Sequence, residues 1–400
     1  MTRDNMTSVV EALGDIRRFQ AVKKISVIRE VVSEELFQAV ARQQGLRSLI
    51  MANCDLSAVE PELLVRAVTR LEEVNMTSMT RTQLTEQQAD AVLTAVCGGA
   101  SRLKTLDMFG TNLSLVNASL LAKAVISLEQ VNLSNTKLTQ QQTKEILTAV
   151  CANGSLLKTL DISWNKLSSV EEGLLARAVK SLEEVKLGRA NLSRQQAEAV
   201  FVATSERDSQ LKNLSMQDNN LSFVDPNILA RAVTSLKEVN LPSNHLTERQ
   251  LEAIFTAITA GHSQLNNLNI QNNYLSSAEP ALLARAVTSL ENVILFCTQL
   301  TKQQLEAIFT TICFGASRLK TLDLTSNRLY SVEKGLLARA VNSLVEVNLS
   351  YISLSRQKAE EILTQSLVKT SLRRLKMDCQ GLDDDLVARA RLAIGSLGRV

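Results

Sequence analysis

The chain has 400 residues, of which 45% are hydrophobic but only 3% aromatic, so Leu, Val, Ile and Ala must fill any interior. Lys and Arg number 44 against 41 Asp and Glu, and the resulting net charge of +3 argues against a strongly basic nucleic-acid-binding protein. The chain has neither an apolar run long enough to span a membrane nor a signal peptide of the usual pattern, so we expect no membrane association.

The first part of the chain, residues 1–45, is interpreted as an N-terminal cap with a degenerate first repeat. Residues Ile28 to Val40 have the same apolar spacing as Leu84 to Val96, which predicts a helix in both places. Three extra residues precede Leu84 when this segment is compared with the next equivalent one. We therefore expect a loop to bulge there.

From residue 46 onward the sequence repeats itself. The pattern L-x-x-L-x-L-x-x-N-x-L occurs as LKTLDISWNKL and returns every 54 residues, at Leu106, Leu160, Leu214, Leu268 and Leu322. A second series, such as LEEVKLGRANL, lies between these motifs and divides the period into 25 and 29 residues. Residues 46–400 are therefore predicted to form about thirteen leucine-rich repeats of two alternating types.

Each repeat reads as a strand, a turn and a helix. In the strand, Leu160 and Ile162 are expected to point inward, while Asp161 and Ser163 point to solvent. The Asn after the strand is expected to bond the turn backbone in a stacked ladder, at Asn165, Asn219, Asn273 and Asn327. A Ser or Thr with Gln three residues later predicts a capped helix start at Thr139, Ser193, Thr247 and Thr301.

These units predict one α/β leucine-rich-repeat solenoid. A strand, a crossover helix and a parallel strand nearly always coil to the right, so we expect a right-handed α/β horseshoe. Its parallel strands would form the concave face and its helices the convex face.

The sequence offers no catalytic set, cofactor motif or metal site. There is no Gly-rich phosphate loop, and the only histidines are His245, expected in an exposed turn, and His262. The six cysteines have no close pairs; Cys97, Cys151 and Cys313 share one repeat column with Ser205 and Thr259 and are expected to be small buried residues, with all six reduced. Glycans on strand sequons such as the one at Asn132 would cover the sheet, which favours a cytoplasmic protein.

A basic column is predicted along the convex helices. These cations could form a ridge that binds a partner or an anion, or they could simply belong to a solvated helix face. We favour the solvated helix face. The column contains Arg66, Lys123, Arg177, Arg231, Arg285, Arg339 and Arg389.

Aromatic side chains on the strand side are the sharper candidates for binding. Phe109, Trp164, Phe296 and Tyr351 are expected at outward positions of the strands or just beyond them, and aromatic residues are enriched at binding hot spots. Stacking on neighbours such as Asn135 or Arg189 is the alternative. The outward column at Asp107, Asp161 and Asp323 varies, with Ser215 and Asn269 at equivalent positions, as an adaptable surface would. The predicted protein-binding residues on the concave face are Phe109, Asp161, Trp164, Lys186, Arg189, Asp218, Phe296 and Tyr351.

The alternating repeats, with lines such as LSSVEEGLLARAVKSLEEVKL, resemble the ribonuclease-inhibitor class of leucine-rich repeats, which also supplies the sensor region of NOD-like receptors. The sequence departs from that class in a compact short unit and in the varied residues at Thr136, Ala190 and Asn244 of the long unit. The resemblance implies a non-enzymatic scaffold that binds a protein or another macromolecule, such as the ligand-recognition region of an innate-immune-type receptor or an adaptor.

Three alternatives stay open. A ribonuclease inhibitor would be acidic, unlike this chain. A GTPase-regulating leucine-rich-repeat protein would have an acidic tail, unlike RARLAIGSLGRV. A designed or consensus-like scaffold would also show the regular 54-residue step.

Overall fold

The computed structural model of the chain describes residues 22–28, 32, 34–43, 45–78, 84–99, 101–329, 331–352 and 354–398. The predicted loop ahead of Leu84 and most of the predicted N-terminal cap lie outside these residues. The chain divides into two compact units, one reaching to residue 203 with residues 208–211, the other holding residues 204–207 and 212 onward. Each unit is described separately.

The first unit alternates strands and helices. In chain order they are β1 (Lys24–Ile28), α2 (Glu34–Arg42), β2 (Ser48–Ala52), α3 (Pro61–Val68), β3 (Glu73–Asn75), α4 (Glu86–Cys97), β4 (Thr105–Asp107), α5 (Ala118–Ile126), β5 (Gln130–Asn132), α6 (Gln140–Val150), β6 (Thr159–Asp161), α7 (Glu172–Lys180), β7 (Glu184–Lys186) and α8 (Arg194–Thr204). The helix predicted over Ile28 to Val40 is found only in part: Ile28 lies in strand β1, and the helix α2 begins at Glu34 and buries Phe37 and Val40.

The second unit continues the alternation. Its elements are β8 (Asn213–Ser215), the 3-10 turn η1 (Leu221–Phe223), α9 (Pro226–Ser235), β9 (Glu238–Asn240), α10 (Glu248–Thr259), β10 (Asn267–Asn269), α11 (Pro280–Thr288), β11 (Asn292–Ile294), α12 (Lys302–Phe314), β12 (Thr321–Asp323), α13 (Lys334–Ser343), β13 (Glu346–Asn348), α14 (Arg356–Val368), β14 (Arg374–Lys376), α15 (Asp384–Ile394) and β15 (Ser396–Gly398).

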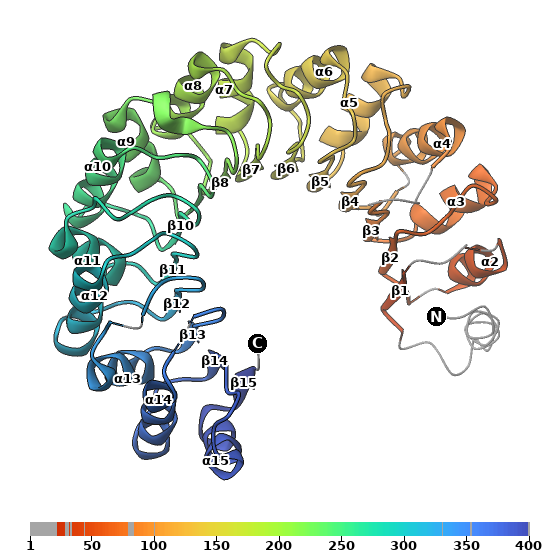
Figure 1. Ribbon diagram of the computed structural model, residues 1–400. Coiled ribbons are helices and arrows are strands. Elements are labelled where there is room, and N and C mark those ends of the chain that lie inside the picture. Colours follow the sequence, from red (N-terminus) through yellow and green to blue (C-terminus); the bar gives the residue numbers. More distant parts are fainter. Residues whose placement is uncertain are drawn as a thin grey trace. The chain divides into compact units, whose positions relative to one another are not determined.

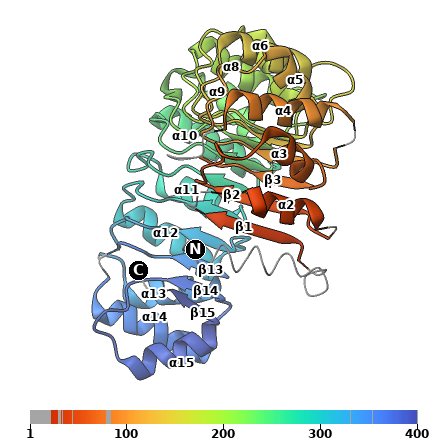
Figure 2. The ribbon, with the colours of Figure 1, turned by 90° about the vertical axis from the view of Figure 1, so that its right-hand side faces the viewer.

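Within each unit, consecutive strands pair in parallel. Leu106 of β4 stands opposite Val131 of β5, which stands opposite Leu160 of β6, so the central strand residues form one apolar row. In the second unit the turned view shows β13, β14 and β15 side by side (Figure 2). The helices cover one side of the strands in each unit and leave the other side open (Figure 1). Each unit is therefore an α/β solenoid, as the sequence predicted.

The core lies between strands and helices. Leu160 and Ile162 are both 1% exposed, which confirms their predicted inward direction. On the helix side, Phe255 and Phe309 occupy equivalent positions of α10 and α12 and are fully buried. Stacking one repeat on the next buries leucines that a lone repeat would expose.

A polar ladder runs beside this core, as predicted. The amide nitrogen of Asn165 donates to Leu133 O at 2.8 Å and to Ile162 O at 3.2 Å, while its oxygen accepts the Leu138 N–H at 3.0 Å. Asn273 repeats the arrangement in the second unit, where it donates to Leu241 O at 2.9 Å. Each Asn thus satisfies turn backbone groups that would otherwise be buried without partners.

The predicted capping boxes are present at the starts of the long-type helices. Thr139 accepts the Gln142 N–H, and the Gln142 side chain accepts the Thr139 N–H at 2.9 Å. The same reciprocal bonds form at Ser193 with Gln196, Thr247 with Gln250 and Thr301 with Gln304. These bonds satisfy backbone donors that a helix start leaves unpaired.

The capping Gln also bridges to the preceding repeat, a role that sequence reasoning missed. The Gln142 amide nitrogen donates to Leu113 O and Val116 O, both at 2.7 Å, and Gln304 donates to Leu275 O and Ala278 O, both at 2.6 Å. Both Gln side chains are buried. In α14 this position is held by Lys358, also buried, whose ammonium donates to Leu329 O at 2.8 Å.

Candidate functional site

The open side of the sheet presents the residues that flank each central strand residue. Asp161 is half-buried and Lys186 is exposed, with its ammonium 3.3 Å from a carboxylate oxygen of Glu184. The Asp161 carboxylate accepts the Ser163 N–H at 2.9 Å, and Asp107 accepts the Phe109 N–H at 2.9 Å in the same way. The variable acidic column therefore ends the strands with side-chain-to-backbone turns, a structural role beside its predicted role in binding.

The Asp107 carboxyl is half-buried and hydrogen-bonded to a neighbouring strand. Asn75 donates to it at 3.0 Å from the neighbouring strand β3. Burial raises its pKa, and the hydrogen bond from Phe109 N–H and those from neighbouring side chains oppose that rise. The Asp107 carboxylate thus already accepts hydrogen bonds from Asn75 and from the Phe109 N–H.

Ser163 corrects the predicted strand alternation. It was expected to point to solvent but is buried, and its hydroxyl accepts the Gly188 N–H at 3.0 Å. The chain has already left the strand here, because β6 ends at Asp161. A strict two-residue alternation no longer applies beyond that point.

The next position in each turn has a left-handed backbone. It is occupied by Asn53, Gly110, Asn135, Trp164 and Arg189 in the first unit and by Asp218, Ser243, Asn272, Cys297, Ser326 and Tyr351 in the second, all with φ between 50° and 74°. Asn and Asp tolerate this conformation, but bulky side chains rarely adopt it. Trp164, Arg189 and Tyr351 are therefore costly occupants of a position where the sister repeats hold smaller residues: Asn, Asp, Ser, Cys or Gly.

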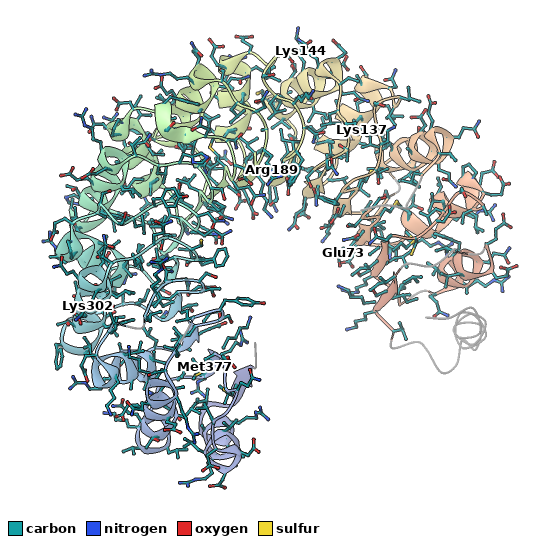
Figure 3. The ribbon with its side chains drawn as sticks, viewed as in Figure 1. Glu73, Lys137, Lys144, Arg189, Lys302 and Met377 are labelled. Atoms are coloured by element: carbon teal, nitrogen blue, oxygen red, sulfur yellow. The ribbon has the colours of Figure 1, made fainter. Side chains whose placement is uncertain are left out.

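Trp164 and Arg189 pair with one another in the first unit. Adjacent turns are joined by the bond from Trp164 N–H to Gly188 O at 2.7 Å, and the Arg189 guanidinium lies 4.1 Å from the centre of the indole ring. This is a cation–π contact, and it matches the stacking alternative weighed from the sequence. Trp164 nevertheless remains 46% exposed, and Figure 3 shows Arg189 on the strand side of its unit, whereas Lys144 projects from the helices.

The four predicted aromatics differ in exposure. Tyr351 is 77% exposed, but Phe109 and Phe296 are half-buried, so these two are less exposed than their expected outward positions implied. Both Phe residues occupy the position equivalent to Ser163, one residue before the left-handed site, where the turn partly covers the side chain. Sequence reasoning missed Tyr274, which is 60% exposed; its only signal was its place directly after the ladder residue Asn273.

In the second unit, amide side chains line the open side between Asp218 and Phe296. Asp218 is half-buried and its N–H donates to Pro242 O at 3.0 Å. Asn292 donates to Asn267 at 2.6 Å, and Asn267 donates to Glu238 at 3.1 Å, so three neighbouring strands share one hydrogen-bonded row. This face is polar and nearly uncharged.

The basic column lies on the helices, where every member is exposed. Arg339 stacks over the Phe314 ring at 5.3 Å from its centre.

Cys97, Cys151 and Cys313 are half-buried, which corrects the expectation that they are buried. Burial raises the pKa of all three thiols, while the neighbouring Lys123, Arg177 and Arg339 respectively partly offset that rise. None of the six cysteines, all of which the structure describes, forms a disulfide.

A groove of about 700 Å³ lies between α2 and α3. Its lining mixes Glu34, Glu60 and Glu62 with Arg42, Arg66 and Arg70, and Arg70 already donates to Ala41 O.

His245 is exposed in a turn, as expected. Within the described part of the chain no group of three or more His, Cys, Asp or Glu is placed to hold a metal ion. Nor does any described helix combine the length and apolar character that a membrane span requires.

No protein-family model matches the chain. No curated protein matches it either. Solved structures do: a chain of the yeast Rad7–Elc1 complex superimposes with a TM-score of 0.53 at 14% identity, over 96% of this chain and 85% of that one.

The chain has the leucine-rich-repeat fold. Two further solved structures are similar: the leucine-rich-repeat-containing protein LegL7 from Legionella pneumophila (TM-score 0.47, 17% identity, 69% of this chain and 94% of that one) and a leucine-rich-repeat protein of Leptospira interrogans (0.41, 16%, 99% and 98%). At these identities the likeness concerns the fold only.

Proposed function

We propose that this leucine-rich-repeat protein is a scaffold that binds a protein partner on the open strand side and the adjoining turns. Trp164 with Arg189 in the first unit and Tyr351 in the second are the proposed anchors. Large exposed aromatic and Arg side chains commonly supply most of the energy of an interface. The predicted residues Phe109 and Phe296 would then contribute partly covered apolar surface. Polar contacts would come from Asp161, Lys186 and Asp218.

The observation that carries this proposal is the placement of bulky residues in left-handed turns. Trp164 has a φ of 61° and Tyr351 a φ of 52°, in a column where Asn135 and Asn272 adopt the same conformation at lower cost. The fold uses the left-handed backbone throughout this column but does not need a bulky side chain there, and such a costly residue motivates a functional hypothesis. Because both rings are exposed, they are available to contact a partner, and we propose that this is their function.

The resemblance to NOD-like receptor sensor regions suggests a finer assignment. In this proposal the chain is the ligand-recognition region of an innate-immune-type receptor, or an adaptor, and it acts in the cytoplasm without catalysis of its own. The yeast neighbour of known structure was solved as a complex of Rad7 with Elc1, so a protein with this fold does assemble with a protein partner.

Affinity capture with matched variants tests the proposal. Trp164→Asn and Tyr351→Asn remove the rings but keep a residue that tolerates the left-handed turn, so the fold should persist by circular dichroism. We expect either change to weaken capture of a specific protein by about 2 kcal/mol. Arg339→Ala, on the helix side, should leave capture unchanged. Equal recovery by Trp164→Asn, Tyr351→Asn and the wild type would contradict the proposal.

A further inference from the structure

The turns that follow strands β4 to β7 carry an excess of positive charge. We define the basic turn edge as segments 108–118, 133–140, 162–170 and 187–195, which contain no Asp or Glu. The exposed carboxylates of Glu171 and Glu172 follow the third segment directly, at the start of α7. Their cations are Lys137, Lys166, Arg189 and Arg194, and all four are exposed. A cluster of one sign without interspersed counter-charges attracts a partner of the opposite sign.

Two of these cations are unneutralised. Lys137 and Lys166 form no ion pair within the described residues, whereas Arg194 pairs with Glu198 at 3.0 Å on the same helix. At the other end of the strands, by contrast, Lys158 pairs with Glu129 at 2.9 Å. Lys158 at the strand-start edge is thus neutralised by a neighbouring repeat, whereas Lys137 and Lys166 at the turn edge form no ion pair with the described residues.

The charge is not a by-product of the repeat. The positions equivalent to Lys137 and Lys166 hold Asn112 and Asn191 elsewhere in the first unit. In the second unit they hold Asn220, His245, Tyr274, Gln299 and Arg328. The turns therefore fold without a cation at these sites, so Lys137 and Lys166 are available for another role.

Apolar surface lies within the basic turn edge. Consecutive turns are held side by side by bonds from Gly110 N–H to Ser134 O at 3.0 Å, from Asn135 N–H to Ser163 O at 2.9 Å and from Trp164 N–H to Gly188 O at 2.7 Å. Because Arg189 covers one face of the indole, Trp164 offers the rest of its exposed ring to a ligand. An apolar centre flanked by cations fits an anionic segment that also carries an apolar side chain.

We infer that the basic turn edge binds an acidic polypeptide segment, whose carboxylates pair with Lys137, Lys166 and Arg189 and whose apolar residue packs on Trp164. This inference rests on the proposed function and names the chemistry of the partner. A nucleic acid fits less well, because the open side of the same strands presents Glu184, Asp161 and Asp107, which would repel an extended polyanion. A short peptide confined to the turns avoids those carboxylates.

Binding of a labelled peptide, with Glu residues flanking one Leu, tests the inference on the full chain by fluorescence anisotropy at low salt. The variant carries Lys137→Asn, Lys166→Asn and Arg189→Asn, residues that sister repeats hold at the same turn positions. We expect its affinity to be about tenfold lower, since three exposed ion pairs contribute about 0.5 kcal/mol each. Arg328→Asn, the equivalent change in the second unit, should leave binding unaltered.

The remaining arms separate the possible failures. The same peptide with Gln in place of Glu should bind at least about tenfold more weakly than the acidic one. If the Gln peptide binds equally well and only Trp164→Asn weakens it, the scaffold proposal stands and the inference of an acidic partner is wrong. Absence of any effect of Trp164→Asn and of the triple variant on binding of the acidic peptide would overturn the inference of an acidic partner, while the scaffold proposal is decided by the affinity capture described above. If a single-stranded oligonucleotide binds more tightly than the acidic peptide, and the triple variant loses that binding, the basic turn edge would be a nucleic-acid site instead.

Discussion

At the scale of single residues, the buried bridge between repeats depends on one side chain with both a donor and an acceptor. Gln304 supplies both: it donates to two carbonyls of the preceding turn and accepts the N–H of its own helix cap. Lys358 occupies the same position in α14 but has no acceptor, so it cannot return the bond to the Ser355 N–H. Burial of its ammonium also lowers the pKa of Lys358.

Lys358→Gln should therefore stabilise the protein at neutral pH by about 1 kcal/mol, since a neutral amide replaces a buried charge and completes the capping box. A lysine whose folded-state pKa is lowered destabilises below that value, and the penalty disappears as pH rises toward the ordinary value of 10.5. The gain in urea unfolding should thus be full at pH 7 and smaller near pH 10.

The reciprocal change is the control. Gln304→Lys should destabilise by about 1–3 kcal/mol at pH 7, because it buries a charge and removes an acceptor. If Lys358→Gln proved destabilising at pH 7, the proposed equivalence of the two positions would be wrong.

At the scale of the element, many of the strands end at an Asn or Asp whose side chain accepts the N–H two residues further on, as in β4, β5, β6, β10, β12 and β13. In β13 the Asn348 oxygen accepts the Ser350 N–H at 3.2 Å, and its amide nitrogen donates to Asp323 at 2.8 Å. Strand β9 differs because the corresponding residue is Pro242, which has no N–H. The Asn240 oxygen is accordingly buried without a hydrogen-bond partner.

This difference predicts unequal costs for the same substitution. Asn348→Ala should destabilise by about 1–3 kcal/mol, because it removes bonds and leaves the buried Ser350 N–H unpaired. Asn240→Ala should cost less than about 0.5 kcal/mol, since the oxygen it removes has no partner. Urea denaturation of the two variants measures the difference, and equal losses would contradict the assigned role of the turn bonds.

The sequence was sufficient to predict elements with a strict period. The alternation around Leu160, the Asn ladder and the Thr-x-x-Gln helix starts all follow from local pattern, and the structure confirms them. It was not sufficient beyond the last strand residue: Ser163 and Phe109 are covered because the chain turns, and nothing local marks Trp164 as left-handed. The second bond of Gln142 joins residues 29 apart, so only the stacked repeats reveal it.

At the scale of the whole molecule, the helix side and the strand side of the units carry different kinds of surface. The helix side carries the Arg column and the α2–α3 groove, where opposite charges are interspersed. The strand side carries the ordered turns, in which hydrogen bonds fix the backbone while Trp164 and Tyr351 project to solvent. A rigid frame that presents exposed rings lowers the entropic cost of binding, because little reordering is needed.

The central claim is that a partner covers the strand side, and oxidative footprinting of the complex with a captured protein tests it most directly. The hydroxyl-radical oxidation rates of Trp164 and Tyr351 report the strand side, and Phe314, which is 70% exposed at the end of α12, reports the helix side. We expect the partner to slow oxidation of Trp164, Tyr351 or both and to leave Phe314 unchanged. Protection of Phe314 with unaltered rates at Trp164 and Tyr351 would place the partner on the helices and contradict the account.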